Sequence, residues 1–185
     1  PADRGRFKLD LGDFYLISGD VWESTLLYSQ VDKAMKDEPL GEEARFKNAK
    51  LAYYRGDFSY AQGLLNVLKA STSELVSNDA MKLSVFITTN LGLDSLLEPM
   101  MKFAQADLYV FQNKLPEALL TLDTLTKTFP AHQLTDDVLF LKAEIALKKQ
   151  DINEAVNRLE EIRSSYSYDL LADDAIFKLA EIYQF

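Results

Sequence analysis

The sequence predicts an all-α fold in which antiparallel helix pairs stack into an α-solenoid, with one extra unpaired helix in the middle. The first observation is an internal repeat, because residues 136–145 return as residues 173–182, an interval of 37 residues. The second is that apolar residues flank the turns at i, i+3, i+4 and i+7, the spacing of a helix with one buried face. The third is a set of small residues at fixed distances from the turns.

Four turns share the register of this repeat. Gly19-Asp20 and Gly56-Asp57 lie 37 residues apart, and so do Asn113-Lys114 and Gln150-Asp151. One small residue stands seven positions before each turn and another five positions after it. These pairs are Gly12 and Ser24, Ala49 and Ala61, Ala106 and Ala118, and Ala143 and Ala155. Small side chains let two helix axes approach closely, so each turn is predicted to join a tightly packed helix pair.

The elements follow in chain order as a single array over residues 1–185. The turns at Gly56 and Asn113 lie 57 residues apart, 20 more than the repeat interval, which indicates one additional helix. We expect repeat 1 at about 6–38, repeat 2 at about 41–71, the extra helix at about 77–90, repeat 3 at about 96–130, repeat 4 at about 134–167 and the first helix of repeat 5 at about 171–185.

The ends of the predicted helices carry residues that suit them. Pro116 is tolerated at a first helical position, and the pairs Asp136-Asp137 and Asp173-Asp174 place carboxylates on positive helix N-termini. Pro39 and Pro130 are expected to stop second helices.

The extra helix must disturb the alternation of first and second helices. We expect a bend or a register change in the superhelix between Leu91 and Glu98. The alternative is that residues 93–99 form a short, irregular second helix and that the superhelix continues.

The small residues, the Gly-Asp turns and the prolines near the repeat ends resemble the tetratricopeptide repeat (TPR). This resemblance implies a right-handed superhelix of TPR helix pairs, although the interval of 37 residues exceeds the usual value of about 34 and Trp is missing from the fourth position. Residues 106–109 and 134–144 look like envelope-associated repeat proteins of Gram-negative bacteria, such as the Tol-Pal cell-division coordinator and outer-membrane-assembly lipoproteins. That subtype implies a periplasmic or outer-membrane-associated parent.

The resemblance also implies a partner-binding face, because the first helices of TPR arrays line a concave groove. The fifth position of each first helix carries Leu9 and then four phenylalanines, and the ninth is acidic over the C-terminal half. The predicted partner-binding residues are Phe46, Lys50, Tyr53, Phe103, Asp107, Phe140, Glu144, Phe177 and Glu181. The alternative is that these rings pack against the adjacent helix.

The groove residues also indicate the kind of partner. Arrays that clamp acidic chaperone tails carry Lys and Asn at these positions, whereas this sequence has Phe and acids. We therefore expect a protein or peptide with apolar and basic side chains.

Composition excludes several other functions. With 29 acidic and 20 basic residues the net charge is −9, which repels nucleic-acid phosphates. No apolar run reaches the roughly 20 residues of a membrane span, so we expect no membrane insertion. There is no Cys and only one histidine, His132, and no phosphate or calcium loop. We expect no enzyme, no cofactor and no metal site, and the absence of Cys leaves both cytosol and periplasm open.

The predicted function is a non-catalytic protein–protein interaction scaffold, in a bacterial cell-envelope assembly if the closer resemblance holds. The alternatives are a structural spacer or oligomerisation segment, and a carbohydrate-binding helical protein using Trp22 and Tyr53-Tyr54. The chain begins at Pro1 without Met and stops within an apolar pattern, so we expect a fragment of a longer protein. Its last helix would then leave an apolar edge for self-association.

Overall fold

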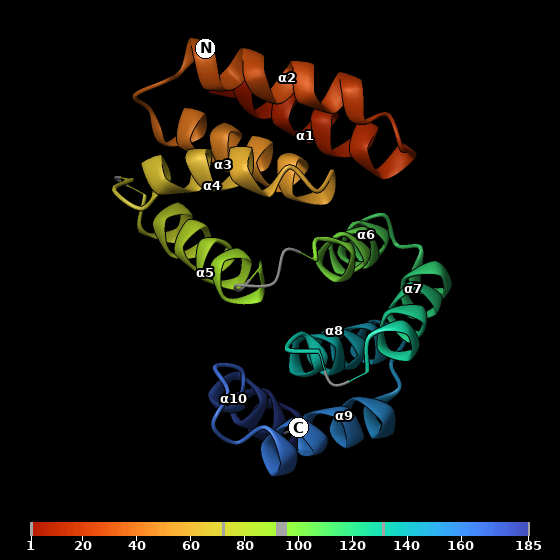
Figure 1. Cartoon of the computed structure of the whole chain (residues 1–185). Helices are drawn as coiled ribbons and strands as arrows, with labels where there is room; N and C mark the ends of the chain where they lie inside the picture. Colours follow the sequence, from red (N-terminus) through yellow and green to blue (C-terminus); the bar gives the residue numbers. More distant parts are fainter. Residues whose placement is uncertain (1, 72, 92–95, 131, 185) are drawn as a thin grey trace. The chain divides into compact units, whose positions relative to one another are not determined.

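The computed structural model describes residues 2–71, 73–91, 96–130 and 132–184, and this part of the chain folds into ten α-helices (Figure 1). These described residues contain no β-strand, so the predicted all-α class is confirmed. The helices are α1 (Ala2–Ser18), α2 (Val21–Ala34), α3 (Pro39–Tyr54), α4 (Phe58–Leu68), α5 (Glu74–Leu91), α6 (Glu98–Phe111), α7 (Leu115–Thr128), α8 (Thr135–Lys148), α9 (Ile152–Ser165) and α10 (Ala172–Tyr183).

The four repeated turns adopt one backbone conformation. Gly19, Gly56, Asn113 and Gln150 have φ angles of 95°, 78°, 57° and 61°, the left-handed region that ends many helices. The residue after each of them donates its N–H to a carbonyl five positions back, at 2.8 to 2.9 Å. The sequence meets this need with Gly twice and with Asn once, residues that enter the left-handed region easily.

The same turns begin the second helices. Asp20, Asp57 and Asp151 each accept a hydrogen bond from the backbone N–H three residues later, at distances of 3.1 to 3.2 Å. These side-chain caps satisfy one of the free N–H groups at the start of α2, α4 and α9. Lys114 stands at the fourth cap position and makes no such bond.

Small residues lie where the paired helices cross. All eight members of the predicted pairs are buried, and the Ser24 hydroxyl donates a hydrogen bond of 2.8 Å to the Gly12 carbonyl. The equivalent residue of α10, Ala180, is exposed, and α10 is the last helix of the described residues.

Pro39 has a different role from the one expected of it. It does not stop α2, which ends at Ala34 and is capped by the N–H of Met35 on the Val31 carbonyl. Pro39 instead occupies the beginning of α3, after Glu38 in an extended conformation. A proline fits there because its missing N–H would have no helical partner and because it favours an extended preceding residue.

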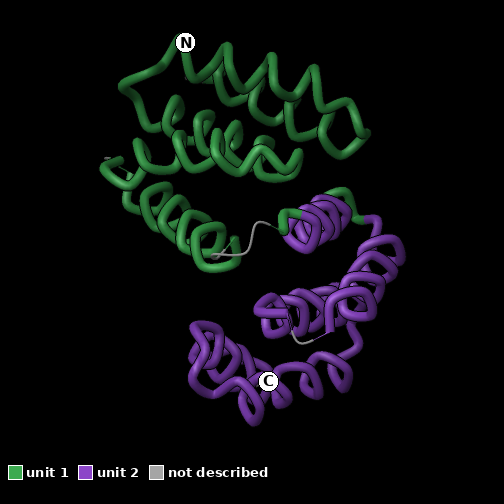
Figure 2. Tube along the Cα trace, viewed as in Figure 1, with its two compact units in different colours: residues 1–97, 111–113 green, residues 98–110, 114–185 purple. Residues whose placement is uncertain are grey.

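The contacts divide the chain into two compact units (Figure 2): residues 1–97 with 111–113, and residues 98–110 with 114–185. In the first unit α1 to α5 pack in chain order, and α1 also touches α3 while α3 touches α5. In the second unit α7 to α10 pack in chain order.

The helix α5 covers the region expected to hold the extra helix, and it packs on α4 and α3. Within the described residues no second helix lies between α5 and α6. The bend was expected between Leu91 and Glu98, and the short irregular helix was expected at residues 93–99. Residues 92–95 lie outside the described residues, so neither alternative is tested.

Candidate functional site

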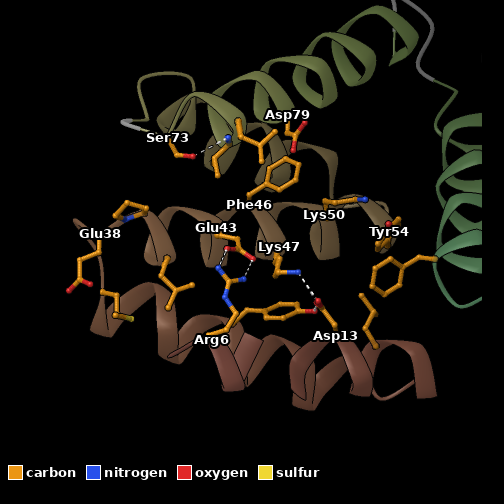
Figure 3. A pocket seen from close by; sticks show the side chains of 18 of the residues that line it. Arg6, Asp13, Glu38, Glu43, Phe46, Lys47, Lys50, Tyr54, Ser73 and Asp79 are labelled. Carbon is orange, nitrogen blue, oxygen red and sulfur yellow. Dashed lines mark hydrogen bonds and ion pairs between the residues drawn. The ribbon is translucent and has the colours of Figure 1, made fainter. Parts of the chain in front are cut away.

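The first unit contains a groove of about 800 Å³ between α1, α3 and α5 (Figure 3). The helix α3 forms its floor, with α1 along one side and α5 along the other. The helices α1 and α3 are the first helices of predicted repeats 1 and 2, and α5 covers the region of the predicted extra helix. Its charged lining residues are Asp3, Arg6, Asp13, Glu38, Glu43, Lys47, Lys50 and Asp79.

Two ion pairs join α1 to α3 along one side of this groove. The Lys47 Nζ atom lies 2.9 and 2.8 Å from the two carboxylate oxygens of Asp13. The Tyr28 hydroxyl donates to the same carboxylate over 2.5 Å. One turn of α3 before Lys47, Glu43 accepts hydrogen bonds from both terminal guanidinium nitrogens of Arg6, each at 2.7 Å. This side of the groove is therefore polar but internally neutralised.

The protonation of two groups follows from these contacts. Burial raises the pKa of Tyr28 well above its usual value, and the hydrogen bond to Asp13 acts in the same direction. The hydrogen bond to Glu43 raises the pKa of Arg6. Both groups keep their protons near neutral pH, so these bonds persist there.

The α5 side of the groove combines apolar side chains with one acid, Asp79. Phe46 from α3 lines the groove together with Leu75 and Val76 from α5, and Leu75 is 72% exposed. Apolar side chains that remain accessible beside an ion-paired wall provide contact area for a partner's apolar residues.

Two of the predicted site residues of unit 1 line this groove, and one does not. Phe46 and Lys50 are half-buried lining residues, and the Lys50 ammonium lies 5.4 Å from the centre of the Tyr54 ring. Tyr53 is only 1% exposed, with its ring 6.0 Å from those of Phe58 and Phe86. Tyr53 therefore belongs to the aromatic core of this unit.

The phenylalanines predicted in unit 2 differ in exposure. Phe103 is buried at 7% exposure, and Phe140 packs against a core cluster drawn from α8, α9 and α10. Phe177 is 66% exposed on α10, the last helix of the described residues.

The acidic residues predicted in unit 2 also differ. Asp107 is half-buried and Glu144 is exposed. Glu181 is half-buried and forms an ion pair of 3.0 Å with Lys178 on the same helix.

Sequence reasoning missed the ion pairs of the groove, although one signal was present. Arg6 and Glu43 occupy the same repeat position, 37 residues apart, and carry opposite charges. Equivalent positions of adjacent first helices are neighbours in a stacked array, so opposite charges there predict a bridge. The bond from Tyr28 to Asp13 had no comparable signal in the sequence.

Two kinds of feature are absent from the described part of the chain. It holds no group of three or more His, Cys, Asp or Glu residues that could bind a metal ion. None of its helices combines the length and the apolar character needed to cross a bilayer.

Replacing Tyr28 by Phe is expected to reduce the alkaline sensitivity of unit 1. A raised pKa means that the folded protein keeps a proton that the unfolded chain releases, so the unfolding free energy falls as pH rises above about 10. A single group changes this slope by at most about 1.4 kcal/mol per pH unit. Urea denaturation at pH about 9 and about 11 should show a shallower decline for Tyr28→Phe than for the wild type.

The matched control is Tyr60→Phe, since Tyr60 is 58% exposed. This variant should retain the wild-type slope. Equal slopes for Tyr28→Phe and the wild type would contradict the assignment.

Comparison with known proteins agrees with the helical-repeat architecture. Residues 98–184 match the family model described as "Tetratricopeptide repeat protein 21 ARM repeat". No curated protein and no solved structure matches the chain. The match supports a TPR or helical-repeat superfamily and, with the all-helical structure, an α-solenoid. It gives no support to the bacterial envelope-associated subtype.

Proposed function

We propose that this helical-repeat protein is a non-catalytic scaffold that binds a protein or peptide partner, and that the groove of unit 1 is its principal binding site. The observation that carries the proposal is a groove of about 800 Å³ with ion pairs along α1 and with accessible apolar residues and Asp79 along α5. A groove lined by three helices suits an extended or helical segment.

The charges of the groove favour a basic partner. Two of its carboxylates are engaged in the ion pairs of Arg6 and Lys47. Asp3, Glu38 and Asp79 lie outside these two pairs, with Lys50 as the remaining cation. The chain as a whole carries a charge of −9. Such a field accelerates the encounter with a basic segment and makes binding sensitive to salt.

Within this proposal, the sequence-predicted residues that contact the partner are Phe46 and Lys50 in unit 1. On unit 2 we include the predicted residues that are exposed or half-buried. These are Asp107, Phe140, Glu144, Phe177 and Glu181. Tyr53 and Phe103 are not included, because their side chains are buried.

A second candidate function is a structural spacer, and the burial of Tyr53 and Phe103 favours it. Rings committed to the seams between helices stabilise an array without contacting a partner. The setting of either function in a bacterial envelope assembly stays a prediction from the closer resemblance.

A displayed peptide library tests the groove directly. Immobilised protein is expected to enrich peptides that combine Lys or Arg with large apolar residues. The double variant Glu38→Lys/Asp79→Lys should bind a selected peptide at least about tenfold more weakly, since each reversal replaces an attraction by a repulsion. Fluorescence anisotropy at two salt concentrations measures the affinities.

The control is Asp37→Lys/Glu74→Lys, which changes the net charge equally. Both of these acids are exposed and lie next to groove residues in the sequence without lining the groove. Equal weakening by both double variants would show only a general charge effect. Failure to enrich any peptide would favour the spacer.

A further inference from the structure

The helix α1 carries an apolar stripe on the face opposite its buried one. Phe7 is 67% exposed and Phe14 is 64% exposed, and half-buried Leu11 lies between them. Spacings of four and three residues place these side chains in one line along the helix. The opposite face carries Leu9 and Leu16, which are buried. Exposed rings in a row are unusual on a protein surface and mark interaction sites.

The internal repeat shows how equivalent faces of this chain are used. Moved forward by 37 residues, the stripe corresponds to Ala44, Asn48 and Leu51 of α3, which are 0%, 9% and 3% exposed. The helix α3 packs on the second helices that precede and follow it, α2 and α4. In α8, the equivalent residues Val138 and Ile145 are likewise buried. A helix therefore covers this face in other repeats, and α2 runs antiparallel to α3.

Charges of opposite sign border the stripe. Asp3 and Asp10 are exposed along one edge, and Lys8 lies along the other. The stripe can be numbered as a heptad repeat in which Phe7 and Phe14 occupy d positions and Leu11 occupies an a position. In this numbering Asp3 and Asp10 occupy g positions, and Lys8 occupies an e position. This is the arrangement by which paired helices select a partner through charge.

We propose that the α1 stripe binds an amphipathic α-helix of a partner protein, antiparallel to α1, with basic residues facing Asp3 and Asp10 and acidic residues facing Lys8. Phe7, Leu11 and Phe14 do not line the groove, whereas Asp3 borders both surfaces. Phe7 occupies the repeat position at which α3 has the much smaller Ala44. A helix that covers the stripe therefore needs small residues opposite the two rings in order to pack at the usual density of a protein interior. The second helices of this chain carry large residues in their seams, such as Tyr28 and Leu65. A foreign helix therefore suits the stripe better than a second copy of the chain.

A designed peptide provides the probe. It is about 21 residues long, three heptads, with Ala at a, Leu at d, Lys at g and Glu at e. A second peptide exchanges the Lys and Glu positions. Fluorescence anisotropy with the full chain should show at least about tenfold tighter binding of the first peptide than of the second.

Variants of the chain locate the binding site. Phe7→Ser/Phe14→Ser should weaken binding of the first peptide at least about tenfold. Tyr60→Ser/Leu120→Ser is the matched control, because its residues are 58% and 69% exposed on other helices, and it should bind as the wild type does. The groove variant Glu38→Lys/Asp79→Lys should also retain binding, which separates this test from that of the groove.

Two results would overturn the proposal. One is equal affinity for the two peptides or for the wild type and Phe7→Ser/Phe14→Ser. The other is a wild-type dimer in sedimentation equilibrium that Phe7→Ser/Phe14→Ser abolishes, since a second copy would then cover the stripe.

Discussion

Replacement of Gly41 by Ala is expected to lower the unfolding free energy by about 2–3 kcal/mol, the upper part of the range for overpacking a tight contact. Gly41 lies in the first turn of α3, where the chain has just left α2. A Cβ atom at this position would overlap the carbonyl oxygen of Met35 and would lie 2.5 Å from its carbonyl carbon. The obstacle is backbone, so no side-chain rotation relieves it. Urea denaturation followed by far-UV circular dichroism measures the loss.

The control for this substitution is Gly63→Ala. Gly63 lies within α4, and a Cβ atom there would have no neighbour within 4 Å. Alanine is the better helix former, so this variant should gain about 0.5–1 kcal/mol. An equal gain from Gly41→Ala would show that α2 and α3 do not approach as closely as described.

Replacement of Leu159 by Ala is expected to cost about 3 kcal/mol, within the range for a large buried side chain. Leu159 is 0% exposed and lies in the core cluster of unit 2 with Leu139, Ile162 and Leu179. These residues come from α8, α9 and α10, so the substitution leaves a cavity at the junction of three helices. Thermal and urea denaturation should both show the loss.

The matched control is Leu120→Ala in α7. Leu120 is also in a second helix but is 69% exposed, and its replacement should change the unfolding free energy by no more than about 0.5 kcal/mol. Similar costs for the two leucines would contradict the cluster as the centre of unit 2.

Local features of this protein were predictable from the sequence because local interactions fix them. The left-handed turns at Gly19, Gly56, Asn113 and Gln150 are the positions that the repeat register singles out. Their conformation depends on residues within one turn of the chain. The small residues at the helix crossings were predictable for a related reason, since consecutive helices joined by a short turn must pack on each other.

The candidate site was less predictable, because it depends on which neighbours cover each side chain. Phe46, Phe103 and Phe177 share one repeat position, yet one is half-buried in a groove, one is buried and one is exposed. Periodicity assigns a face of the helix, and it does not show whether another helix lies on that face.

The sequence by itself determined the helical class, the repeat interval, the turns and the crossings, because these rest on contacts between residues close along the chain. Tertiary structure alone decided that Pro39 begins a helix, that Tyr53 is a core residue and that Asp13 joins Tyr28 and Lys47. Each of these outcomes depends on the packing of separate helices, where the burial of apolar surface and the neutralisation of charge select among arrangements that the pattern of residues allows equally.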